Sequence, residues 1–166
     1  MEELLKLKEN LSIKRPSTWE TLPDIELYKD QVLNYMQRQY TLQPGDNQLT
    51  GAMINNYIKS GLLPRANGKR YTKDHLAYLT AISSLKQVLS MSETDFLLKQ
   101  QPHISDTEQF YIEFCQQMNE ALTETANKLD EKLPKEQLAV AALRLAVSSY
   151  AQKLACEKIL DILKEW

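Results

Sequence analysis

The chain has 166 residues and a net charge of −2, with 43% hydrophobic and 25% charged residues. Only four glycines and six prolines are present, a composition that excludes low complexity and disorder and predicts a folded protein. No stretch approaches the roughly 18 uninterrupted apolar residues of a membrane span, and the acidic start lacks the basic-then-apolar layout of a signal peptide. We therefore expect a cytoplasmic protein with no membrane partner.

The first forty residues predict two helices. Residues 1–11 have leucines at helical spacing and predict one or two turns, and Pro16 marks the loop that follows. From about Ile25 to Tyr40 apolar residues again recur at helical spacing, and Asp24 is placed to cap the first turn. The segment Gln-Pro-Gly-Asp-Asn at residues 43–47 then predicts a break in the chain.

Residues 50–60 predict a short amphipathic helix with both ends specified locally. Thr50 can cap its first turn, and Gly61 can take the left-handed conformation after it, with Leu62 placed to touch Tyr57 in a Schellman-type end. At 100° per residue one face is apolar and the opposite face is free for solvent or a ligand. The apolar face comprises Met53, Ile54, Tyr57 and Ile58, and the opposite face comprises Gly51, Ala52, Asn55, Asn56 and Lys59.

The next segment predicts a small β-hairpin. Asn67-Gly68 is the strongest short-range signal for a two-residue hairpin, so we expect a wing over residues 63–71, anchored by Leu63 and Tyr71. Thr72 then caps a helix with one narrow apolar stripe, and residues 92–95 begin a shorter helix that ends near residue 100. The stripe comprises Tyr78, Ile82, Leu85 and Leu89, flanked by Ala81 and Val88.

Basic residues concentrate in this middle part of the chain. Residues 50–90 carry six basic side chains against one acid, a net charge of +5 that leaves −7 for the remainder. Such segregation is typical of a DNA-binding head on a non-binding body. The alternative is an ordinary solvated face.

The order of helix, hairpin and helix resembles the DNA-binding head of MerR-type regulators. Residues 22–98 resemble more closely the uncharacterised bacterial domain-of-unknown-function family eighteen-thirty-six, which is itself grouped with MerR-like heads. The MerR family usually has a basic residue in the recognition helix where this chain has Asn55. The matching positions are Thr50, residues 53–57, 61–65, Asn67-Gly68, Arg70-Tyr71, Leu76, Leu79, Ile82 and Leu85-Lys86.

The resemblance implies a DNA-binding transcription regulator, with the helix at 50–60 in the major groove and the wing at 63–71 on phosphates. Asn55 and Asn56 would pair with adenine, each good pair discriminating by about 1 to 3 kcal/mol. Tyr57 would mainly pack, with its hydroxyl near a phosphate. The small Gly51 and Ala52 would let the helix start approach the duplex. Thr50, Lys59, Arg65, Lys69, Arg70 and Lys73 complete the candidate DNA-binding residues.

Beyond Pro102 the sequence is helical. Residues 105–108, Ser-Asp-Thr-Glu, form a capping box before a helix with an apolar face, and Pro134 suits the first turn of a last helix over residues 135–166. That helix is apolar on a wide arc without a clean heptad seam, so we expect it to pack on the preceding helix and on a second subunit. Alternatively, the tail is an effector domain whose pocket is lined by Phe110, Tyr111, Phe114, Met118 and Tyr150, with an unknown ligand.

No catalytic motif or metal-ligand spacing is present, so we expect no enzyme, no cofactor and no metal. His75 is expected on a helix surface, and Cys115 and Cys156 are expected as buried, reduced thiols. The predicted fold is mostly α: an N-terminal extension (1–20), a MerR-like winged helix-turn-helix head (21–101) and a helical dimerisation or effector region (102–166). The alternative function is a protein-interaction or ligand-sensing adaptor whose winged helix does not bind DNA.

Overall fold

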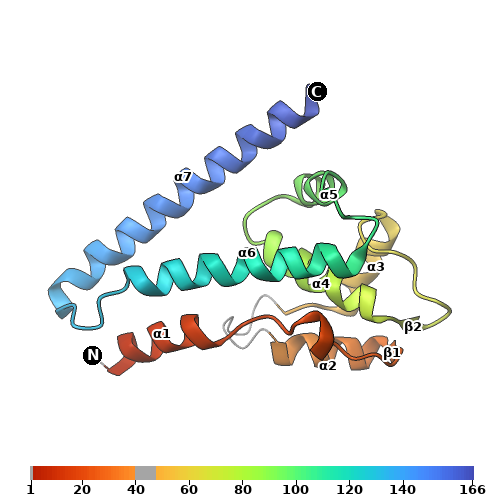
Figure 1. The fold of residues 1–166 in the computed structure, drawn as a ribbon, viewed down its shortest axis with the longest axis horizontal. Helices are drawn as coiled ribbons and strands as arrows, with labels where there is room; N and C mark the ends of the chain where they lie inside the picture. The colour runs from red at the N-terminus through yellow and green to blue at the C-terminus, as the bar shows by residue number, and fades with distance from the viewer. Residues whose placement is uncertain (1, 40–47) are drawn as a thin grey trace.

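The computed structural model describes residues 2–39 and 48–166, and in them the fold is mostly helical with one two-stranded antiparallel sheet (Figure 1). The predicted helix end at Tyr40 and the predicted break at 43–47 lie outside the described residues. The elements are α1 (Glu2–Ile13), η1 (Trp19–Thr21), β1 (Leu27–Tyr28), α2 (Lys29–Gln39), α3 (Gly51–Lys59), β2 (Arg70–Tyr71), α4 (Lys73–Leu85), α5 (Met91–Lys99), α6 (Thr107–Lys128), η2 (Lys135–Gln137) and α7 (Leu138–Lys164).

The start of α2 differs from the prediction. Residues 27 and 28 form β1 instead of helix, and they pair with β2 in the register Leu27 to Tyr71 and Tyr28 to Arg70. The Tyr28 N–H donates to Gln31 Oε1 at 2.8 Å. A backbone N–H at the start of α2 is thus paired with Gln31, where Asp24 was expected to be the cap. Leu27 is buried and Tyr28 exposed, which is the alternation of a half-buried strand.

The predicted extent, N-terminal cap and terminating glycine of α3 are confirmed, whereas the predicted Schellman-type end is not. The Met53 N–H donates to Thr50 Oγ1 at 3.2 Å, and Gly61 ends the helix with a φ of +80°. The Gly61 N–H donates to the Ile58 carbonyl, but the Tyr57 carbonyl accepts from the Leu63 N–H, one residue later than in a regular Schellman end. Ile54 and Tyr57 are buried on the inner face.

The predicted hairpin is present only as a tight turn. Asn67 and Arg70 exchange backbone hydrogen bonds of 3.0 and 3.1 Å, so Gly68 and Lys69 are its central residues. Gly68 has a φ of +62° while Lys69 has a negative φ, as in a type II′ turn. The strand that leaves this turn pairs with β1 and not with residues 63–66, so the predicted sheet partner was wrong. Both predicted anchors, Leu63 and Tyr71, are buried.

The central helix is α4, which is buried around most of its circumference. Its contacts with α2, α6 and β2 cover several sides, so the predicted narrow stripe was too narrow. Thr80 is fully buried, and its hydroxyl donates to the Leu76 carbonyl at 2.8 Å. The buried residues of α4 are His75, Leu76, Ala77, Leu79, Thr80, Ala81, Ile82 and Ser83.

Two helix starts after α4 differ slightly from the prediction. A Ser90–Glu93 capping box opens α5 two residues before the predicted start. Asp106, not Ser105, caps α6 by accepting from the Gln109 N–H at 3.2 Å.

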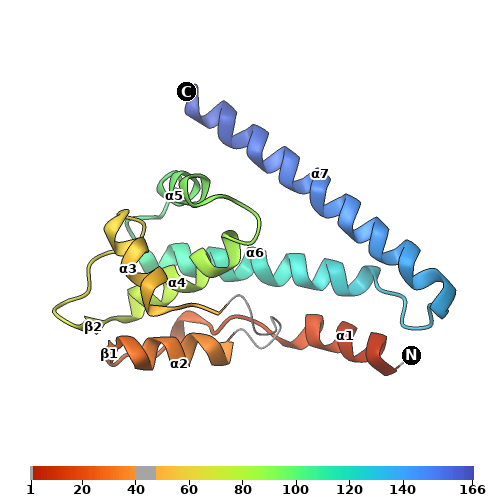
Figure 2. The same ribbon diagram turned by 180° about the vertical axis from the view of Figure 1, so that it is seen from behind.

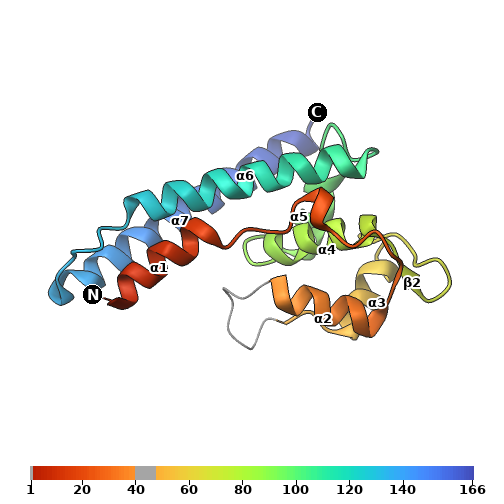
Figure 3. The ribbon, with the colours of Figure 1, turned by 60° about the horizontal axis from the view of Figure 1, so that its bottom comes forward.

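The hydrophobic core joins α6 to the earlier elements. Phe110 and Tyr111 are buried, and the Tyr111 hydroxyl donates to the Ser17 carbonyl at 2.7 Å. On its outer side α1 packs along α6 (Figure 3).

The last helix, α7, diverges from α6 (Figures 1 and 2). Its main contacts are with η2 and α5, where Lys164 Nζ lies 5.7 Å from the centre of the Phe96 ring. Leu160 is the one buried side chain of α7. The expected packing along α6 was therefore wrong: a helix with apolar residues all round does not specify which face meets its neighbour. None of the described helices is long and apolar enough to cross a membrane.

Candidate nucleic-acid interface

The outer face of α3 presents small and polar side chains. Ala52, Asn55, Asn56 and Lys59 are exposed and Gly51 is half-buried, whereas the inner face is fixed by Ile54 in the core. The predicted division of the two faces is thus confirmed. The two adjacent asparagine amides offer donors and acceptors from a rigid helix, which suits reading the edges of bases.

Lys29, which sequence analysis missed, lies across this face. Its Nζ donates to Asn55 Oδ1 at 2.5 Å, and its Cδ lies 3.4 Å from where a Cβ on Gly51 would be. Lys29 reaches α3 because the pairing of β1 with β2 fixes the start of α2 beside it. No local sequence signal marks this contact, since it depends on a strand partner some forty residues away.

A small basic hollow adjoins Lys29. Its volume is about 390 Å³, and it lies between the end of β1 and the 67–70 turn. The turn carries Lys69, which is exposed, so two lysines from distant parts of the sequence border one hollow. A hollow with two ammonium groups and aromatic walls favours an anionic group such as a phosphate. It is lined by Tyr28, Lys29, Gly68, Lys69 and Tyr71.

Two of the predicted DNA-binding residues are engaged within the protein. Lys73 Nζ lies 2.9 Å from Asp24 Oδ1 and 4.8 Å from the centre of the Trp19 ring, and its side chain is largely covered. Arg70 lies 3.6 Å from Glu26 and 5.5 Å from the centre of the Tyr28 ring, and it remains more than half exposed. Lys73 therefore serves the fold, and Arg70 is partly neutralised.

Tyr57 and Thr50 are also committed to the fold. Tyr57 is buried, and that burial raises the pKa of its phenol. The Thr50 hydroxyl is occupied by the helix cap. Arg65, like Lys59, is exposed. The candidate residues that the structure leaves accessible around α3 are Gly51, Ala52, Asn55, Asn56, Lys59, Arg65, Lys69 and Arg70, with Lys29 added.

His75 ties the turn to α4. It was expected at the surface, but it is only 6% exposed. The Thr72 N–H donates to His75 Nδ1 at 3.0 Å, which leaves Nε2 to donate to the Arg65 carbonyl at 3.3 Å. The ring also meets Tyr71 edge to face, with the centroids 5.4 Å apart. His75 is thus a positioning residue for the basic turn.

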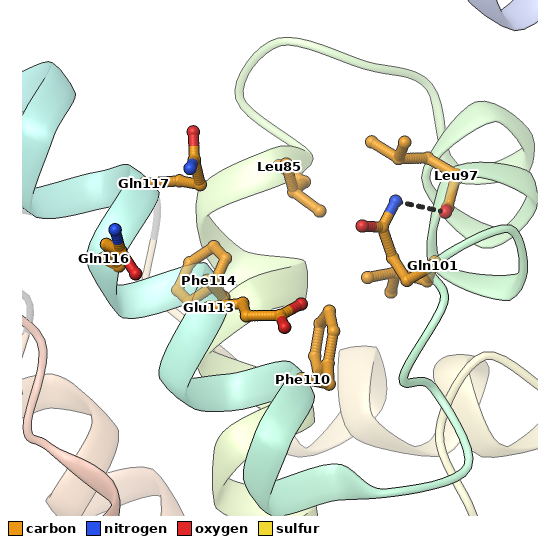
Figure 4. A pocket seen from close by; sticks show the side chains of 9 residues that line it. Leu85, Leu97, Gln101, Phe110, Glu113, Phe114, Gln116 and Gln117 are labelled. Carbon is orange, nitrogen blue, oxygen red and sulfur yellow. Dashed lines mark hydrogen bonds between the residues drawn. The ribbon is translucent and has the colours of Figure 1, made fainter.

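A second hollow, of about 440 Å³, lies where α4, α5 and α6 meet (Figure 4). Phe110 and Phe114 face it, as does Leu85, and the Gln101 amide donates to the Leu97 carbonyl at 3.0 Å. The other residues of the predicted effector pocket do not line it: Tyr111 is in the core and Tyr150 is exposed on α7. The aromatic residues of the predicted effector pocket therefore do not lie together: Phe110 and Phe114 line this hollow, and Tyr111 and Tyr150 do not.

The thiols and carboxylates of the described residues form no metal site. No group of three or more His, Cys, Asp or Glu that could hold a metal occurs in residues 2–39 and 48–166. Cys115 is free and buried, and burial raises the pKa of its thiol. Cys156 is also free but only half-buried, so the expectation that both thiols are buried was wrong for this residue.

Comparison with known proteins places the central part of the chain in a family. Residues 17–118 match the family model described as Domain of unknown function (DUF1836). No curated protein and no solved structure matches the chain. The match begins after α1, includes α2 to α5 with the two-stranded sheet, and ends within α6, so α7 lies beyond it. Because the matched residues make up more than half of its length, this chain belongs to the DUF1836 family.

Proposed function

We propose that this protein is a sequence-specific DNA-binding transcription regulator. Its head would be MerR-like: α2 and α3 form the helix-turn-helix, α3 enters the major groove, and the 67–70 turn acts as the wing. The observation that carries the proposal is the convergence of Lys29 and Lys69 on a hollow beside the exposed Asn55. Two cations beside a rigid polar helix suit phosphate positioning next to base reading.

The contacts have separate roles. In the free protein Lys29 occupies the oxygen of the Asn55 amide, so Lys29 must move to a phosphate before Asn55 can pair with adenine. Lys69 lies at the tip of the turn and holds a second phosphate. Asn56 is exposed one residue further along α3 and reads the adjacent position. Affinity would come mainly from the lysines and specificity from the asparagines.

The direct test is selection of bound duplexes from a randomised DNA pool at moderate salt, followed by affinity measurements over a range of salt. We expect Asn55→Ala with Asn56→Ala to relax sequence preference while leaving non-specific binding. We expect Lys29→Gln with Lys69→Gln to weaken binding to all duplexes and to reduce the salt slope by about 2 for each protomer. Lys6→Gln with Lys99→Gln is the matched control, since both side chains are exposed on α1 and α5. No enriched sequence, with the protein folded, would contradict the proposal.

A second candidate function is a protein-interaction adaptor. The pairing of Arg70 with Glu26 and of Lys73 with Asp24 favours it, because both pairs reduce the positive charge beside α3. An adaptor would have the same fold but no salt-dependent affinity for duplex DNA. The salt series above therefore separates the two functions.

We also propose that the regulator is a homodimer formed through α7. From Val140 to Leu154 the exposed apolar side chains of α7 include a series spaced by three and four residues, as in a coiled-coil seam, which Ile159 and Ile162 do not continue. Ten large apolar side chains of α7 are exposed around the helix, and the five that follow this spacing lie along one side of it. Two heads would then read two half-sites about one helical turn apart. The seam comprises Val140, Leu143, Val147, Tyr150 and Leu154.

A further inference from the structure

An apolar groove lies behind the candidate recognition helix. It has a volume of about 530 Å³ and separates α3 from the end of α4 and the start of α5. Leu89 is buried in its wall, and the flexible side chains of Met53 and Met91 border it. Methionine walls adapt to the shape of an apolar ligand. The lining residues are Met53, Asn56, Tyr57 and Ser60 of α3 together with Lys86, Leu89, Ser90 and Met91.

Lys86 places one cation in this groove. Its Nζ lies 3.7 Å from the Met53 sulfur, and no ion pair in the described part of the chain involves it. Burial lowers the pKa of the Lys86 ammonium, because removal from water disfavours the charged form. An ammonium group that faces a thioether instead of a carboxylate is stabilised by any anion that enters the groove and pairs with it.

We propose that this groove binds a small carboxylate with an apolar body, its carboxylate pairing with Lys86 and its hydrocarbon lying against Met53, Leu89 and Met91. The apolar walls supply the burial, and the single cation selects the acid over a neutral molecule of the same shape. Lys86 itself is not a candidate DNA contact, although Asn56 and Tyr57 of the groove are among the candidate DNA-binding residues.

Four of the lining residues belong to α3, and one of them, Asn56, is a candidate base contact. Occupancy of the groove therefore changes the surroundings of the recognition helix directly. This regulatory part of the inference rests on the proposed DNA binding, whereas carboxylate binding itself does not. An occupied groove should change the affinity for the selected duplex by at least severalfold.

The test uses octanoate as the probe, octan-1-ol as its neutral counterpart, and the full chain labelled at its methionine methyl groups. We expect octanoate to shift the NMR signals of Met53 and Met91 but not those of Met36 in the core or Met118 on α6. Lys86→Met should weaken octanoate binding about tenfold or more and leave octan-1-ol binding unchanged or tighter. Lys59→Met, on the outer face of α3, is the matched control and should bind both probes like the original protein.

The outcomes separate the two proposals. Equal binding of the two probes, an unchanged preference in Lys86→Met, or shifts away from Met53 and Met91 would overturn the inference. A groove that binds octanoate in a protein that selects no duplex would support the inference and reject the proposed function. Selection of a duplex without octanoate binding would reject the inference alone. If Lys86→Met fails to fold, Lys86→Gln gives the same comparison.

Discussion

His75 is the residue on which the position of the basic turn depends most directly. It accepts from the Thr72 N–H at the start of α4 and donates to the Arg65 carbonyl before the turn. The His75 ring is buried, so its removal leaves the Thr72 N–H and the Arg65 carbonyl without this partner and takes a packed side chain out of the fold. This residue connects the fold to the candidate interface without being a candidate DNA contact.

We expect His75→Ala to lower the free energy of unfolding by about 1 to 2 kcal/mol, because the buried ring is lost and two part-buried backbone groups lose their hydrogen-bond partner. Urea denaturation measures the change. His103→Ala is the control, since His103 is exposed and its ring lies 3.5 Å from the exposed Glu113. Equal losses in the two variants would show that the buried bridge contributes nothing.

The hydrogen bonds of Glu93 at the start of α5 make the stability of the protein depend on pH. Its carboxylate accepts from the Ser90 N–H and hydroxyl, and these hydrogen bonds lower the pKa of Glu93 below the usual 4.5. Since the folded pKa lies below the unfolded one, the stabilisation is present above the unfolded pKa and is lost as the pH falls through the folded pKa. We expect the stability difference between the original protein and Glu93→Gln to shrink as the pH falls below about 4. Urea titrations from neutral to acid pH measure it, and a difference constant with pH would contradict this assignment.

Among the elements, the extent and the two faces of α3 could be predicted because the signals at both of its ends are local. Thr50 caps it, Gly61 ends it, and the alternation of Ile54 and Tyr57 with the asparagines fixes its faces. The start of α2 could not be predicted, since Leu27 and Tyr28 fit a helical period and become a strand only by pairing with residues 70 and 71. The same long-range pairing explains why Lys29 was missed at the site. The acids that occupy Lys73 and Arg70 lie in the segment before β1, whose approach no local pattern reveals.

The end of α3 gives a prediction about a single backbone angle. A Cβ on Gly61 would meet no atom within 4 Å, so the cost of Gly61→Ala comes from its φ of +80° alone. We expect this variant to lose about 1 to 2 kcal/mol of stability by thermal or urea denaturation. Gly51→Ala is the matched control, because Gly51 lies in α3 with no positive φ and its added Cβ would meet only the flexible Lys29. A Gly61→Ala variant as stable as Gly51→Ala would contradict the expected strain.

At the scale of the whole molecule, the core and the last helix behave differently. Core residues run from Leu22 to Cys115 and join the predicted head to α6. The last helix contributes only Leu160 to the buried set, and it lies beyond the region matched by the family. The head therefore has its own hydrophobic core, whereas the exposed apolar side chains of α7 are the surface that the proposed homodimer would bury.

We expect the original protein to sediment at twice the chain mass of 19.2 kDa and Leu143→Lys with Tyr150→Lys to sediment at the single-chain mass. Both side chains are about two-thirds exposed in the single chain, so the substitutions remove the seam without opening the core. Analytical ultracentrifugation measures the mass. Ile13→Lys is the control, since Ile13 is equally apolar and exposed but lies at the end of α1. A double variant that remains dimeric would place the interface elsewhere.

The two-residue sheet also sets an order of events during folding. Each strand contributes only two residues, and the paired positions are some forty residues apart, so a long loop must close before the pairing stabilises anything. The 67–70 turn and α3, whose hydrogen bonds are local, can form before that closure. The contact of Lys29 with Asn55 closes a shorter loop, since these residues are 26 positions apart. The surface on which α3, Lys29 and Lys69 meet is thus complete only when β1 has paired with β2.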